Sequence, residues 1–327
     1  MDKVDLVNEL NNRINQEIEN ILLPEFPQNL YEPIKYILTI GGKRLRPLLL
    51  LLSNKIFGGN IEDAINPAIG LEIFHNFTLL HDDIMDKAEI RRNKPTVHIN
   101  WNENIAILSG DAMMIIANKY FTQTGSIHLK QVLDIFNNTA LEVCEGQQYD
   151  MNFESRLDVT EEEYIEMIRL KTSVLIASAF KIGAVIAGAN SEDADNIYNY
   201  GINIGLCFQL QDDFLDTFGD KNVFGKKIGG DIVANKKTFL LISALNLAND
   251  KTRKYLLELI QNKSILEEVK INEVKNIYNQ LNIASLLKSK IDYYYLKAEK
   301  YLSAIKISEE NKNYLTQYIE KLHTRNN

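Results

Sequence analysis

The chain has 327 residues, of which 45% are hydrophobic and 24% charged, a composition typical of a folded globular protein rather than a disordered one. Its 36 basic and 44 acidic side chains give a formal net charge of -8, so the clustered positive charge of a nucleic-acid-binding protein is not expected. No apolar run is long enough to span a bilayer and the first residues do not resemble a secretory signal, which favours a soluble, cytoplasmic protein.

Apolar residues recur at helical spacing in nearly every segment, and the alternation typical of strands is almost absent. We therefore predict an all-α fold, a single-domain helical bundle over residues 1–327. The expected helices cover residues 2–22, 29–39, 45–57, 62–87, 103–123, 127–153, 161–189, 192–219, 233–248, 252–262, 268–281, 285–304 and 308–323. Glycines at 41–42, 58–59 and 188 are expected to end helices. Thr160 with Glu163, and Ser191, are expected to cap helix starts.

The segment GGKRLRP, residues 41–47, joins two of the predicted helices. Its two glycines free the backbone, and Lys43, Arg44 and Arg46 place three cations within four positions. Such a cluster is suited to binding an oxyanion. Taken alone, the segment is more simply explained as a solubilising loop.

The predicted helix at 62–87 closes in DDIMD, so its last turn is acidic. Asp82 and Asp86 are four residues apart and share one face, whereas Asp83 is turned about 100° away. Paired carboxylates suit Mg²⁺, which usually completes its shell with water and substrate phosphates. A lone motif of this kind is more often a solvated helix end. Carboxylates at a helix C-terminus are disfavoured by the helix dipole, however, and need a counter-charge.

A second copy of the pattern strengthens the metal-site interpretation. Residues 205–220 read GLCFQLQDDFLDTFGD, an apolar helical run that places Asp212 and Asp216 on one face. Two acidic ridges on apolar helices are expected to share cations. With the basic residues beside them they favour a site for a diphosphate that carries an apolar tail. These basic residues are Lys43, Arg44, Arg46, Arg91, Arg92, Lys171, Lys226, Lys227, Lys236 and Lys237.

In this order the motifs resemble those of the trans-isoprenyl diphosphate synthases, the polyprenyl synthetase family. The resemblance covers nearly the whole chain and rests on GGKRLRP, DDIMDKAEIRR, GQQYD, RLKTS, GLCFQLQDDFLD and the segment containing GKKIGGD and NKKT. It implies a bundle of the isoprenoid synthase type around a central apolar cavity. It also implies that an allylic diphosphate ionises, is attacked by the alkene of isopentenyl diphosphate, and loses a proton to give a longer allylic product.

The resemblance further implies a role for each site residue. A cluster of three Mg²⁺ ions would be held by Asp82, Asp86 and Asp212, with Asp83 and Asp216 assisting. The allylic diphosphate would be held by Arg91, Lys171, Lys226 and Lys236. Isopentenyl diphosphate would be held by Lys43, Arg46, His75 and Arg92. The allylic carbon would be faced by Thr172 and Gln209.

Product length is expected to depend on the helix that carries the first motif. The growing tail should run back from Asp82, and each residue advances it by only about 1.5 Å. Phe77 lies five positions before Asp82, beside the small Thr78, which resembles short-chain enzymes with one aromatic barrier. We expect geranylgeranyl diphosphate as the product, with farnesyl diphosphate as the alternative.

Two other functions are compatible with a helical bundle. A class I terpene cyclase would carry an Asn/Asp-Ser/Thr-Glu triad in place of DDFLD, and an inactive partner subunit would have lost aspartates or lysines that are present here. One departure from the family is Asn235, where glycine is frequent before Lys236, and the roles of Gln147 and Asp150 in GQQYD stay open. The family usually forms homodimers, and we expect the helix at 105–120 to form the interface.

Overall fold

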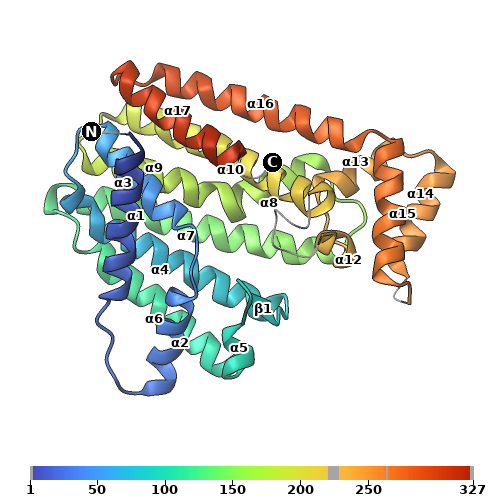
Figure 1. Ribbon diagram of the computed structural model, residues 1–327, viewed down its shortest axis with the longest axis horizontal. Helices are drawn as coiled ribbons and strands as arrows, with labels where there is room; N and C mark the ends of the chain where they lie inside the picture. Colours follow the sequence, from blue (N-terminus) through green and yellow to red (C-terminus); the bar gives the residue numbers. More distant parts are fainter. Residues whose placement is uncertain (1–2, 220–227, 263, 325–327) are drawn as a thin grey trace. The chain divides into compact units, whose positions relative to one another are not determined.

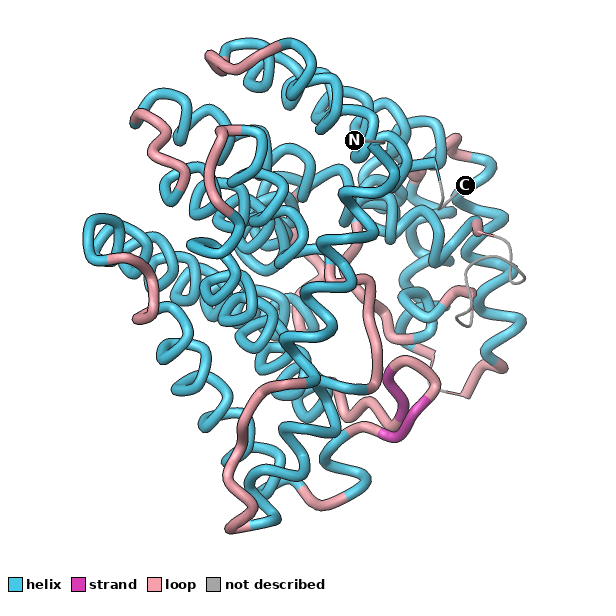
Figure 2. Tube along the Cα trace, turned by 60° about the vertical axis from the view of Figure 1, so that its left-hand side comes forward, coloured by secondary structure: helices cyan, strands magenta, loops and turns pink. Residues whose placement is uncertain are grey.

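The computed structural model describes residues 3–219, 228–262 and 264–324 and divides into two compact units. Unit 1 comprises Met1–Asn137 and Ala179–Ala194, and unit 2 comprises Asn138–Ser178 and Asp195–Asn327. Within the described ranges, regular structure is helical except for one short two-stranded hairpin (Figure 2). None of the helices in these ranges is long and apolar enough to cross a membrane. The all-α prediction is confirmed, and the single-domain assignment stays a prediction.

Unit 1 is organised around the helix that carries the first aspartate motif. Its elements are α1 (Lys3–Glu19), α2 (Gln28–Thr39), α3 (Leu45–Ile56), α4 (Ile61–Met85), β1 (Ile90–Arg91), β2 (Lys94–Pro95), α5 (Val97–Asn100), α6 (Glu103–Phe121) and the start of α7 (Ser126–Glu154). The helix α4 packs against α3 and α6 (Figure 1) and is buried along most of its length. Its Phe74 meets Phe136 edge-on at 5.2 Å between ring centroids, and Phe136 stacks on Phe121 at 4.1 Å. This aromatic stack fixes the middle of α4.

Unit 2 is built on the helix that carries the second motif. Its elements are the rest of α7, α8 (Glu161–Ile168), the π-helical turn η1 (Arg169–Ser173), α9 (Val174–Ile186), α10 (Ser191–Phe218), α12 (Gly230–Val233), α13 (Phe239–Leu247), α14 (Asp250–Gln261), α15 (Glu267–Gln280), α16 (Ile283–Ala304) and α17 (Glu309–Thr324), with α9 and α10 also contributing residues to unit 1. In Figure 1 the long helix α16 runs along α10, and the Cys207 thiol donates to the carbonyl of Ile291 at 3.4 Å. The second motif thus ends a helix that α16 covers.

Most predicted helix ends are confirmed. Gly41, Gly58 and Gly188 follow helices with φ of 96°, 82° and 82°, the left-handed backbone that glycine adopts without strain. Thr160 and Glu163 form the predicted capping box of α8. The cap assigned to Ser191 is wrong, because the side chain of the preceding Asn190 accepts the Asp193 backbone N–H at 2.9 Å.

Two predicted helices differ from the structure. The helix expected at 161–189 is interrupted by η1 at RLKTS. The helix expected at 233–248 begins only at Phe239, because Asn235 adopts left-handed backbone with φ 58° after α12. The amide oxygen of Asn235 accepts from the Lys270 ammonium on α15 at 2.6 Å. Asparagine tolerates this conformation, which explains how it replaces the glycine expected before Lys236.

Candidate active site

The first aspartate motif forms the last turn of α4. Asp82 and Asp83 belong to the helix and Asp86 is its C-cap, with the Asp86 backbone N–H donating to the Asp82 carbonyl at 2.8 Å. Asp83 is 2% exposed, whereas Asp82 is partly exposed and Asp86 is exposed. The predicted split of the motif is therefore present: the outer residues are at least partly exposed to solvent, whereas the middle one is buried.

The middle aspartate has a cationic partner. Arg91, from the hairpin, donates its Nε to both Asp83 carboxylate oxygens at 2.9 and 2.8 Å, and its Nη2 lies 2.7 Å from Oδ1. The same nitrogen is 3.6 Å from Asp82. Burial raises the pKa of Asp83, and the Arg91 guanidinium opposes that rise. This geometry does not favour the expected metal-assisting role of Asp83, because its carboxylate is buried and engaged in holding Arg91.

The residues expected to bind isopentenyl diphosphate gather at the glycine pair before α3. Arg92 has left-handed backbone, φ 53°, and its guanidinium donates to the Gly41 carbonyl in the space that a side chain at Gly42 would fill. Arg46 lies with its Nη1 3.0 Å from His75 Nε2. Loss of hydration, together with the positive charges of Arg46 and Arg92, lowers the pKa of His75 well below 6.5. Because arginine can only donate, His75 is neutral and accepts through Nε2.

The middle cation of GGKRLRP has a structural role. Arg44 is 6% exposed; its Nη1 lies 2.8 Å from the Glu72 carboxylate on α4 and its Nη2 2.6 Å from the Leu38 carbonyl. The hypothesis that all three cations of the segment form one oxyanion site is therefore wrong for Arg44. It anchors the turn to α4, while Lys43 is exposed.

In unit 2 the π-helical turn presents Lys171 and Thr172 side by side. The Lys171 ammonium is 2.6 Å from the Asp150 carboxylate. Asp150, the last residue of GQQYD, therefore contacts the lysine of RLKTS. Thr172 donates its hydroxyl to the Gln209 amide oxygen at 3.1 Å. Lys171 and Thr172 are thus each held by another helix, α7 and α10 respectively.

The second aspartate motif repeats the split of the first. Asp213 is 3% exposed and accepts from Gln209 Nε2 at 3.2 Å and from the Tyr164 hydroxyl. Burial, followed by repulsion from Asp231, raises the pKa of Asp213 well above its usual value. Asp212 is exposed, and Asp216 accepts the Asp231 backbone N–H at 3.0 Å. In both motifs the first and last aspartates are at least partly exposed to solvent, whereas the middle one is buried.

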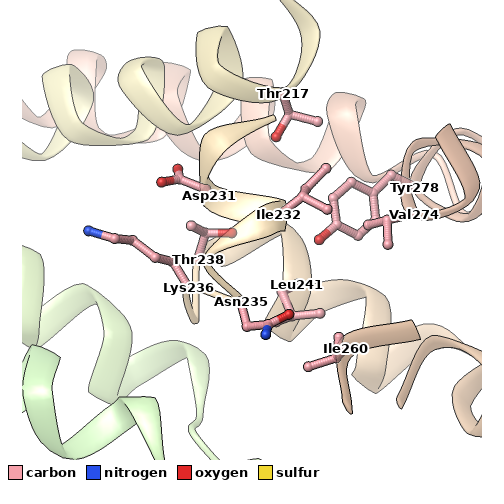
Figure 3. Close-up of a pocket in the computed structure, with 10 residues that line it drawn as sticks. All are labelled: Thr217, Asp231, Ile232, Asn235, Lys236, Thr238, Leu241, Ile260, Val274 and Tyr278. Carbon is pink, nitrogen blue, oxygen red and sulfur yellow. The ribbon is translucent and has the colours of Figure 1, made fainter. Parts of the chain in front are cut away.

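The two lysines before α13 have different roles. Lys236 lines a pocket with Asp231, and in Figure 3 its ammonium and the Asp231 carboxylate extend to the same side. Lys237 is buried and donates to the carbonyls of Glu154 and Asn235 at 3.2 and 3.1 Å. Lys236 thus lines the pocket, whereas Lys237 fixes the loop through two backbone carbonyls. Lys226, also expected in the site, lies outside the described residues.

Sequence reasoning missed three side chains that shape these sites. Asp231 follows the glycine pair of GKKIGGD, a segment noted for its lysines, so a signal was available. Glu72 and Tyr164 belong to no sequence motif, and each is recognisable only through the buried group it contacts.

Phe77, expected to limit product length, packs on Phe74 at 5.6 Å and on His81 at 4.7 Å between ring centroids. Thr78 donates to the His75 carbonyl at 2.8 Å.

The donor set suits Mg²⁺. Within each unit, the described residues bring no three His, Cys, Asp or Glu side chains together as a metal site. Each motif by itself offers its two outer carboxylates. Mg²⁺ is usually bound by one or two carboxylates together with substrate phosphates and water, so this hard-oxygen set fits the ion.

Comparisons with known proteins agree with these features. The family model described as Polyprenyl synthetase matches residues 27–281. The geranylgeranyl diphosphate synthase of Sulfolobus acidocaldarius is 39% identical over 90% of this chain and 87% of its own. The geranylfarnesyl diphosphate synthase of Aeropyrum pernix is 36% identical over 90% of this chain and 94% of its own. A crystal structure of a geranylgeranyl pyrophosphate synthase superposes with a TM-score of 0.93 at 44% identity, covering 98% of this chain and 99% of that one.

The helical fold and the paired aspartate motifs define an all-α prenyltransferase. Family membership follows from the extent of the match, which spans well over half of the chain. The chain belongs to the polyprenyl synthetase family.

Proposed function

We propose that the protein is a Mg²⁺-dependent short-chain prenyltransferase that condenses isopentenyl diphosphate with allylic diphosphates to give geranylgeranyl diphosphate. The observation that carries the proposal is the split within both aspartate motifs, where the middle residue is buried and the outer two are at least partly exposed to solvent. An inactive subunit has no need to keep both arrangements. Family membership supports the reaction, and the names of two of the relatives described above support the product.

Mg²⁺, three ions in the proposed active site, would be held by Asp82, Asp86 and Asp212, with Asp216 assisting. When bound, the ions supply Lewis-acid stabilisation of the diphosphate charge. The chain adds fixed cations for the allylic diphosphate: Arg91 held by Asp83, and Lys171 held by Asp150. Lys236, and Lys226 from outside the described residues, complete this proposed set.

The hydroxyl of Thr172 has a defined orientation. Because it donates its proton to Gln209, its oxygen lone pairs are left for a carbon that becomes cationic as the allylic C–O bond ionises. No covalent nucleophile is required.

Isopentenyl diphosphate would be bound in unit 1 by Lys43, Arg46, His75 and Arg92. His75 accepts from Arg46 and so sets the direction of that guanidinium, while the Gly41 carbonyl sets that of Arg92. The neutral histidine adds no charge of its own. Two oriented guanidiniums suit the oxygens of a diphosphate, which accept paired hydrogen bonds.

The proposal is tested by incubating the purified protein with isopentenyl diphosphate, Mg²⁺ and dimethylallyl, geranyl or farnesyl diphosphate, followed by chromatography of the products. We expect geranylgeranyl diphosphate, and loss of product with EDTA. Asp82→Asn and Asp212→Asn should lower kcat by at least about 10²-fold, the scale of losing one electrostatic contact in a transition state. Asp134→Asn, at an exposed acid that pairs with Lys130 on the surface, is the matched control and should retain activity. Farnesyl diphosphate as end product would favour the alternative, and no product from any substrate would refute the proposal.

We also propose a homodimer formed through α6. That helix exposes Ile107, Leu108 and Ile115 by 43%, 60% and 64%. An apolar row of this kind is typical of an interface helix. Analytical ultracentrifugation of Leu108→Glu beside the wild type would test it, with dissociation expected for the variant only.

A further inference from the structure

Two glycines allow neighbouring helices to approach the π-helical turn η1 unusually closely. A methyl group placed on Gly146 of α7 would lie 2.7 Å from the Lys171 Cα and 2.8 Å from the Leu170 carbonyl carbon. A methyl group on Gly205 of α10 would lie 2.6 Å from the Ser173 Cα and 2.7 Å from its Cβ. Ordinary van der Waals contact begins at 3.4 Å, so neither position can hold a side chain unless the backbone moves.

Each glycine is followed four residues later by a side chain that holds the turn. Gly146 precedes Asp150, the partner of Lys171, and Gly205 precedes Gln209, the partner of Thr172. Residues four apart lie on one helix face. On α7 and on α10, therefore, the point of closest approach and the hydrogen-bonding group form one surface directed at η1.

We propose that Gly146 and Gly205 are positioning residues that fix the Lys171 ammonium and the Thr172 hydroxyl by letting α7 and α10 pack directly on the backbone of η1. The inference rests on the proposed function, which assigns Lys171 to the allylic diphosphate and Thr172 to the allylic carbon. A π-helical turn adds one residue to a helix, and such turns are frequent at functional sites. Contact with two helices on its main chain holds this turn in one register.

The expected effect of an added methyl group follows from the overlap. Restoring ordinary contact at Gly146 requires a displacement of at least about 0.7 Å of the Lys171 backbone, and misplacement of about 1 Å can cost ~10²-fold in rate. We expect Gly146→Ala and Gly205→Ala to lower kcat per folded molecule by about 10- to 100-fold. The KM for isopentenyl diphosphate should stay within about twofold, because the residues proposed to bind it are in unit 1.

The matched control is Gly183→Ala in unit 1. A methyl group there would lie 2.9 Å from both the Asn54 backbone nitrogen and the Ser53 Cβ on α3, a comparable overlap away from η1. It should lower the urea midpoint as much as Gly146→Ala does while leaving kcat per folded molecule within about threefold. Ser173→Gly added to Gly205→Ala removes one of the overlapping groups and should recover part of the folding and of the kcat loss.

A double-mutant cycle separates positioning from general destabilisation. If Gly146 acts through Lys171, Gly146→Ala should cost much less in a Lys171→Gln background than in the wild type. The inference would be overturned if Gly146→Ala lowered kcat equally in both backgrounds, or if Gly146→Ala and Gly183→Ala lowered kcat equally. In either case an active wild-type protein would still support the proposed function. A wild-type protein that forms no prenyl product, or Lys171→Gln with unchanged kcat, would overturn both.

Discussion

Replacing Phe77 with alanine should lengthen the product by one isoprene unit. Phe77 lies five residues before Asp82, about 7.5 Å along the axis of α4, and Phe74 lies about 4.5 Å further back. An isoprene unit adds four carbon–carbon bonds to the chain, roughly 5 Å of reach. Removing the Phe77 ring therefore opens space for about one unit.

The structure also sets an upper limit on the lengthening. Phe74 is fully buried and held edge-on by Phe136, which in turn stacks on Phe121. This stack stays in place when Phe77 is shortened, so the tail should stop there. We expect a shift of the main product from twenty to twenty-five carbons, not an open-ended series.

The assay is chromatography of products made from radiolabelled isopentenyl diphosphate and farnesyl diphosphate. Thr78→Ala is the control, because it removes little volume and a hydroxyl already bonded to the His75 carbonyl. It should leave the product unchanged. An unaltered product from Phe77→Ala would refute the reasoning, and products beyond twenty-five carbons would show that Phe74 is not the second barrier.

Three further predictions concern stability and are measured by urea unfolding. Glu72→Ala should lower the free energy of unfolding by about 3–5 kcal/mol, because it leaves the Arg44 guanidinium buried without its carboxylate; a change below about 1 kcal/mol would contradict that role. Because the pKa of folded His75 is lowered, the unfolded chain binds the additional proton below about pH 6.5, and wild-type stability should fall with decreasing pH relative to His75→Gln. Parallel pH profiles would be inconsistent with a neutral His75. Glu299→Gln should raise the free energy of unfolding at pH 7 by ~1 kcal/mol. Burial and the nearby Glu320 raise the pKa of the Glu299 carboxyl, and its Oε1 has no hydrogen-bond partner within the described residues. The advantage of Glu299→Gln should disappear below pH 4.5, where the wild-type carboxyl is protonated in both states.

The sequence was sufficient for the features that depend on local periodicity. The helical pattern of α4 predicted that Asp83 would turn away from Asp82 and Asp86, and the structure shows Asp83 buried, Asp82 partly exposed and Asp86 exposed. Glycines with positive φ were identified at Gly41 and Gly188 because few other residues adopt that backbone.

Features that depend on tertiary partners could not be read from the sequence. One added residue at η1 shifts the helical period too little to detect in a five-residue window, so α8 and α9 were predicted as one helix. Arg44 and Arg46 are chemically alike in a three-cation segment, and the buried Glu72 opposite Arg44 separates this structural cation from Arg46, the one proposed to bind substrate. The same holds for Lys236 and Lys237, which differ in what faces them.

The contact between Asn235 and Lys270 links the C-terminal half of the chain to the proposed active site. The Lys270 ammonium lies in the interior and also reaches the carbonyl of Val233 at 3.3 Å, so it secures both ends of the short bend that leads into Lys236. A deletion that removed α15 would thus remove this support from Lys236, which is proposed to bind substrate, while leaving every aspartate of the two motifs in the chain. Because α15 also carries Val274, Ile277 and Tyr278 of the core of unit 2, its loss should disturb the packing of that unit as well as the position of Lys236.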